Sequence, residues 1–111
     1  MLKIVEEKYE ENVYLLQTEE YPDGKLKSVQ HFRNGLRHGQ AKTYYPSGNI
    51  ESKNDFLDDK LEGRCINYYD MPGKLIKDVL NFKNGKPHGK QSSYSTSRKL
   101  LFRDFYKNGK K

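Results

Sequence analysis

The sequence predicts an all-β protein, an elongated single-layer antiparallel β-meander of about eight strands made of stacked hairpin repeats. Three observations predict it: a block recurs every 24 to 26 residues, each block holds two turn motifs, and polar and apolar residues alternate between the turns. Aromatic residues and glycines keep the same spacing, as in Phe32, Phe56 and Phe82 and in Gly39, Gly63 and Gly89. This skeleton is typical of repeat proteins in which each unit buries its apolar face against the next.

The chain divides into an acidic leader and a basic repeat region. The leader, residues 1–20, holds six Glu and two Lys and has a net charge of −4, whereas the remainder of the chain has a net charge of +10. The copies span residues 21–44, 45–68 and 69–94, with a partial copy at 95–111. We expect the leader to be a capping strand that covers the first strand edge, as repeat proteins require. Within it, Val5 to Glu11 fits one short helical turn.

Turn dipeptides mark both ends of the strands. Asn-Gly pairs tolerate positive φ, and the Pro-x-Gly motifs begin with the fixed φ of proline. Strands are therefore predicted near residues 12–20, 25–33, 39–45, 50–57, 63–69, 74–83, 89–95 and 99–106. Two departures predict a bulge or a protruding turn: Asp59 stands where other copies have glycine, and the third copy has two extra residues around 70–73.

Composition narrows the class of protein. The chain has 111 residues, of which 33% are hydrophobic and 32% are charged, which suits a thin fold better than a compact globule. Cys65 is the single cysteine, so no internal disulfide is expected. The sequence shows neither a secretory signal nor the roughly 20 apolar residues that cross a bilayer, and a reducing cytoplasm is the expected location.

Catalytic and metal chemistry are not expected. Cys65 has no visible base, and the carboxylates recur without a repeated pair. His38 and His88 occupy the same position in two copies, and these two and His31 lack Cys or acidic companions at ligand spacing. We therefore predict no enzyme, no bound metal and no cofactor.

The motif Tyr-Tyr-Pro-x-Gly-x-Ile/Leu, followed by Phe-x-Asn-Gly-Lys-x-x-Gly-x-x-x-x-Tyr, resembles the membrane occupation and recognition nexus (MORN) repeat. More closely, it is similar to the bacterial variant grouped as the YwqK family of proposed antitoxins of toxin-antitoxin systems. The resemblance covers residues 21–111. It implies a MORN-like sheet and a small cytosolic antitoxin or immunity protein that neutralises a toxin by direct binding.

The candidate partner-binding residues are aromatic and basic. Adjacent tyrosines on a strand point to opposite faces, so one member of a pair can pack while the other contacts a partner. The phenylalanines, including Phe105, are interpreted mainly as structural. The candidates are Tyr45, Tyr69, Arg64, Arg37, Lys60 and Lys86. A solvated basic face is the competing interpretation.

Several partners are compatible with this composition. Nucleic acid is disfavoured because no recognised motif accompanies the basic residues. The alternative to a toxin is a MORN-type scaffold that binds anionic phospholipid or other proteins at a membrane surface. The basic charge of the repeats implies a toxin with an acidic face, unless the glutamates of the leader do the blocking. Exposed terminal strands also allow an edge-paired dimer.

Overall fold

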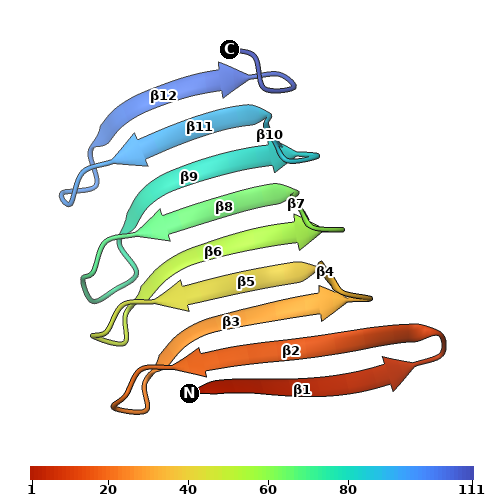
Figure 1. Cartoon of the computed structure of the whole chain (residues 1–111). Coiled ribbons are helices and arrows are strands. Elements are labelled where there is room, and N and C mark those ends of the chain that lie inside the picture. The colour runs from red at the N-terminus through yellow and green to blue at the C-terminus, as the bar shows by residue number, and fades with distance from the viewer.

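In the computed structural model, which describes residues 1–111, every element is a β-strand and the chain forms one open antiparallel sheet. The strands are β1 (Leu2–Tyr9), β2 (Asn12–Glu20), β3 (Leu26–Arg33), β4 (Leu36–Arg37), β5 (Gly39–Tyr44), β6 (Ile50–Leu57), β7 (Lys60–Leu61), β8 (Gly63–Tyr68), β9 (Ile76–Lys83), β10 (Lys86–Pro87), β11 (Gly89–Tyr94) and β12 (Leu100–Tyr106). Long strands follow one another in chain order, while β4, β7 and β10 are short extensions beside the turns (Figure 1). The predicted all-β meander is confirmed.

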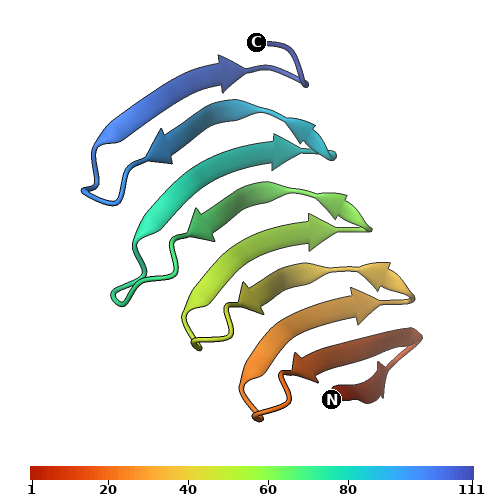
Figure 2. The ribbon, with the colours of Figure 1, turned by 60° about the vertical axis from the view of Figure 1, so that its left-hand side comes forward.

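The sheet is a single curved layer that nothing covers on either face (Figure 2). Its extents are 43 × 37 × 15 Å, and its radius of gyration is 15.8 Å, against about 13 Å for a compact domain of this length. Only seven residues are buried. The buried apolar side chains Ile50, Cys65 and Tyr68 make a small core, and Tyr68 faces Ile76 across the β8–β9 pair.

The expected helical turn at Val5 to Glu11 is wrong. These residues belong to β1 and to the two-residue turn after it, because β1 pairs with β2 along its whole length, from Leu2 opposite Glu19 to Tyr9 opposite Asn12. The leader therefore continues the sheet as a hairpin. β2 covers the edge of β3, and β1 becomes the new outer edge.

Asp59 does not shift the register of its hairpin. Asp58 and Asp59 have φ of 47° and 71°, as the Asn-Gly pairs of the other copies do, and Leu57 still pairs with Lys60. Aspartate can adopt this left-handed conformation because its short side chain finds local hydrogen bonds. The longer turn of the third copy is also accommodated outside the ladder, since the Tyr69 amide still donates to the Leu75 carbonyl at 2.9 Å.

Each full copy does carry two bulges, at positions that the sequence did not indicate. One lies at the beginning of each long strand, where the register shifts between Thr43 and Tyr44 and between Asn67 and Tyr68. The other contains the repeated glycine, which has φ of +85° at Gly39. These bulges twist and bend the strands.

Candidate protein-binding surface

The tyrosine that opens each copy bonds to the last residue of the same copy along one border of the sheet, which we call the proline border. Tyr45 donates its hydroxyl hydrogen to the Tyr68 carbonyl oxygen at 2.7 Å, and Tyr69 donates to the Tyr94 carbonyl at 2.8 Å. The corresponding bond in the first copy runs from the Tyr21 hydroxyl at 2.6 Å. Both candidate tyrosines are half-buried, and each hydroxyl ties the opening turn of its copy to the end of that copy's last strand.

The extra residue of the first bulge sets the electrostatics beside each of these tyrosines. Lys27 and Lys77 each place the ammonium nitrogen 5.8 Å from a ring centroid, of Tyr21 and Tyr69 respectively. The second copy has Glu51 instead. Burial, followed by the carboxylates of Glu51 and Asp70, raises the pKa of Tyr45.

We expect Tyr45→Phe to lower the free energy of unfolding by about 1 kcal/mol, because it removes the hydrogen bond between the first and last residues of the second copy and leaves the Tyr68 carbonyl without that donor. Urea denaturation at neutral pH measures this. Tyr9→Phe is the matched control, since Tyr9 is 68% exposed, and it should change nothing. Because the folded state favours the neutral phenol, wild-type stability should also fall as the pH rises past the ordinary tyrosine pKa of 10.0, and less steeply in Tyr45→Phe. Equal stability of both variants would contradict the structural role.

Arg37 links the first and second copies at the opposite border, which we call the turn border. Its Nε lies 2.7 Å from Asp59 Oδ1, and its Nη2 donates to the Asp59 carbonyl at 3.2 Å. Its guanidinium carbon lies 4.4 Å from the ring centroid of Phe56. The hydrogen bond from Arg37 lowers the pKa of Asp59. Arg37 therefore has internal partners.

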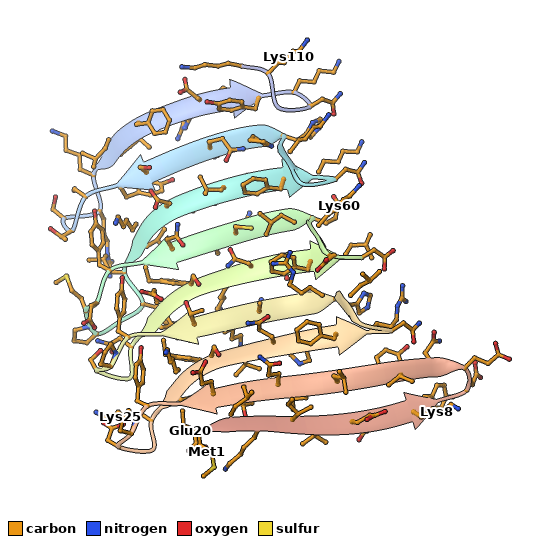
Figure 3. The ribbon with its side chains drawn as sticks, in the orientation of Figure 1. Met1, Lys8, Glu20, Lys25, Lys60 and Lys110 are labelled. Carbon is orange, nitrogen blue, oxygen red and sulfur yellow. The ribbon has the colours of Figure 1, made fainter.

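Lysines continue the turn border beyond Arg37. Lys60 on β7 and Lys86 on β10 are exposed and have the same place in successive copies, which Lys110 extends (Figure 3). Gly85 lies against the stem of Lys60, and Gly109 against the stem of Lys86, since an added Cβ would meet those stems at 3.7 to 3.8 Å. We call Lys60, Lys86 and Lys110 the basic row; none of them forms an ion pair.

The six predicted candidates do not form one site. Arg37, Lys60 and Lys86 lie together on the turn border, whereas Tyr45 and Tyr69 lie on the proline border. Strands of eight residues span about 25 Å, so the two groups are far apart.

The remaining candidate, Arg64, stands on neither border. It is exposed on β8, opposite Asn81 of β9.

A row of rings crosses the sheet beside the basic row, as the repeated spacing of Phe32, Phe56 and Phe82 indicated. In register, Phe56 lies opposite Gly39, and Phe82 lies opposite Gly63. The members of this aromatic row are Leu15, Phe32, Phe56, Phe82 and Tyr106, all half-buried. Its face of the sheet is called the aromatic face.

The assignment of Phe105 to this row was wrong by one residue. Tyr106 is the residue opposite Gly89, while Phe105 points to the other face and is 64% exposed. The spacing of 24 residues from Phe82 to Tyr106 equals the spacing from Phe32 to Phe56. The repeat spacing alone could therefore have identified Tyr106 as the residue of this row.

Next to the aromatic row, polar side chains satisfy one another across the sheet. The Asp78 carboxylate accepts hydrogen bonds from Asn67 at 3.2 Å and from Ser93 at 2.7 Å. Thr43 and Ser52 share a hydrogen bond of 2.6 Å. Such a ladder fixes the orientation of the side chains before any partner arrives.

The surface is larger than a chain of this size normally exposes. The accessible area is 7504 Å², whereas a compact monomer of this mass exposes about 6,400 Å². The excess is similar to the roughly 800 Å² that each partner buries in a stable complex. The aromatic row and the basic row together are therefore our candidate protein-binding surface.

The chain's single thiol, Cys65, is buried within β8. Burial raises its pKa, with a further contribution from the Asp55 carboxylate, so the reactive thiolate is disfavoured. His38 and His88 lie beside the turn border, where His88 Nδ1 accepts a hydrogen bond from the Asn108 amide at 3.2 Å. No three His, Cys, Asp or Glu side chains gather as a metal ligand set.

Fold and surface define a stacked β-hairpin repeat protein with an open sheet. Residues 15–34 and 37–58 match the family model of the MORN repeat variant, and residues 81–90 match that of the MORN repeat. These segments are therefore similar to MORN repeats, as the sequence motifs indicated, and such repeats generally bind proteins or membranes.

Comparison with curated proteins gave no match, and comparison with solved structures gave none either. No helix with the length and apolar character of a membrane span occurs in the structure.

Proposed function

We propose that this chain is a non-enzymatic antitoxin or immunity protein of the cytoplasm, which neutralises a toxin by binding it through the aromatic row and the basic row. The observation that carries the proposal is the uncovered single-layer sheet, on which a row of half-buried rings runs beside cations without ion-pair partners. Aromatic residues and exposed cations are the groups that anchor and steer protein complexes. The antitoxin assignment itself rests on the resemblance to the YwqK family.

The surface is organised before binding. At the proline border a tyrosine hydroxyl ties the first residue of each copy to its last. At the turn border backbone bonds join successive copies, such as the Gly85 amide to the Leu61 carbonyl at 2.9 Å. A pre-formed surface binds with little ordering cost. The basic row favours a partner with acidic residues at the matching border.

The experiment tests neutralisation with a charge-reversal variant. The product of a reading frame adjacent to the gene is expressed alone and with this chain, and cell growth is followed. Growth should stop with the neighbour alone and recover with the wild-type chain. Lys60→Glu, Lys86→Glu and Lys110→Glu combined should weaken the complex at least roughly tenfold and abolish recovery.

The matched control reverses three exposed lysines near the proline border, Lys25→Glu, Lys74→Glu and Lys99→Glu, with the same change in net charge. This control should still restore growth. Loss of recovery in both variants would assign the effect to net charge, and a harmless neighbour would overturn the antitoxin role.

A second candidate function is a scaffold that binds anionic phospholipid, and the basic row is the observation that favours it. Sedimentation with vesicles separates the two candidates. Binding to anionic vesicles but not to neutral ones, lost in the basic-row variant only, would favour the scaffold.

A further inference from the structure

The N-terminal strand β1 presents an unpaired edge. Met1 and Glu20 exchange two hydrogen bonds, from the Met1 amine at 2.8 Å and from the Glu20 amide at 2.9 Å. Hydrogen-bonded pairs alternate along an antiparallel ladder, so Lys3, Val5 and Glu7 bond to β2. The backbone groups that point outward belong to the residues between them: Leu2, Ile4, Glu6 and Lys8. Every residue of β1 is exposed.

The charges along β1 are complementary to those of β1 in a second copy of the chain when the two strands run antiparallel. In a twofold-symmetric antiparallel pair, one residue lies opposite its own copy. If that residue is Val5, Lys3 lies opposite Glu7 of the second copy, and Glu7 lies opposite Lys3. These pairs fall between the outward hydrogen-bonded positions, where opposed side chains are closest.

Pairings of the two β1 strands centred on other residues give less favourable charge contacts. Pairing centred on Glu6 would place two carboxylates against each other, and pairing centred on Ile4 would lose both opposite-charge contacts. At the other end of the sheet, pairing of β12 centred on its middle residue would oppose two copies of Arg103. Like charges directly opposite are destabilising.

Exposed apolar side chains lie along the same axis. Val5 is 56% exposed and pairs with Leu16 of β2, which is 37% exposed. When the pairing is centred on Val5, Leu16 and Val5 of one copy and the same two residues of the second copy form one row across the strands. Lys3 also has a contact of 3.2 Å with Glu20, but both groups are partly exposed and such a pair contributes little.

We propose that β1 pairs antiparallel with β1 of a second copy, centred on Val5, to make a twofold-symmetric continuous sheet. The axis is perpendicular to the sheet, so both aromatic faces lie on the same side and the candidate protein-binding surface is doubled. A dimer of this kind engages two partners or two sites of one partner at once. The pairing does not depend on the identity of that partner.

The test is sedimentation equilibrium of the full chain from low micromolar to millimolar concentration. The wild-type mass should rise from 13.1 kDa to twice that value. Glu7→Lys and Lys3→Glu should each weaken dimerisation roughly tenfold or more, because each places like charges in two contacts. The double variant should restore it, since the pairs reform with reversed sign.

Two controls keep the proposal specific to this edge and register. Glu6→Lys makes the same charge change but lies opposite Ile4 of the second copy, and it should leave the dimer intact. Ile4→Pro removes an outward amide hydrogen and should abolish the dimer. A wild-type chain that stays monomeric at every concentration, or a double variant as weak as the single ones, would overturn the proposal.

Discussion

Phe56→Ala should lower the free energy of unfolding by about 2 to 3 kcal/mol. Removal of a fully buried Phe costs about 3 to 5 kcal/mol, and the ring of Phe56 is half-buried between Gly39 and Leu61. The Arg37 guanidinium also loses the ring that it contacts at 4.4 Å. Because Gly39 and Arg37 belong to the first copy, the loss of Phe56 weakens the contact between the first and second copies. Urea denaturation followed by circular dichroism measures the change.

Phe105→Ala is the matched control, and it also tests the assignment of Tyr106 to the aromatic row. Phe105 is 64% exposed on the other face, so its removal should cost less than about 0.5 kcal/mol. Equal losses for Phe56→Ala and Phe105→Ala would mean that the row does not hold the copies together.

The long strands from β2 onward could be predicted from the sequence to within two residues, whereas the two-residue strands β4, β7 and β10 were not predicted. Turn chemistry explains this success: Asn34-Gly35 and Asn84-Gly85 both have positive φ, which few other residue pairs adopt without strain. The alternation of residues between such turns then leaves only one arrangement of the strands.

The leader could not be predicted in the same way. The segment LKIVEEKY has adjacent glutamates and lysines, which favour helix locally, and no Asn-Gly follows it. Its strand conformation comes from pairing with β2 along its full length, a tertiary contact that overrides propensity.

The candidate surface was predicted in part. The basic residues at the turn border could be identified because they recur at the same position of successive copies, as Lys60 and Lys86 do. The hydroxyl bonds of Tyr45 and Tyr69 were not, because the accepting carbonyls lie 23 and 25 residues further along the chain and meet the hydroxyls only in the folded sheet. Bulge positions leave no signal in a single sequence, since Lys, Glu and Leu all occupy them.

The two borders have different roles in this molecule. The proline border is internally bonded by tyrosines, while the lysines of the turn border have no ion-pair partner. Rigidity on one side and free charge on the other are compatible with a module that holds its shape and recognises an acidic partner.

Gly63→Ala should lower the free energy of unfolding by about 1 to 3 kcal/mol, through the backbone alone. Gly63 has φ of +95° in the second bulge of its copy, where an L-residue with a Cβ is strained. Space does not explain the effect, because the added Cβ would meet Asp55 at an ordinary 3.8 Å. Gly63→Asn should cost less than Gly63→Ala, since asparagine tolerates this region better, although it is larger. If asparagine costs more than alanine in urea denaturation, crowding rather than backbone strain makes the glycine necessary.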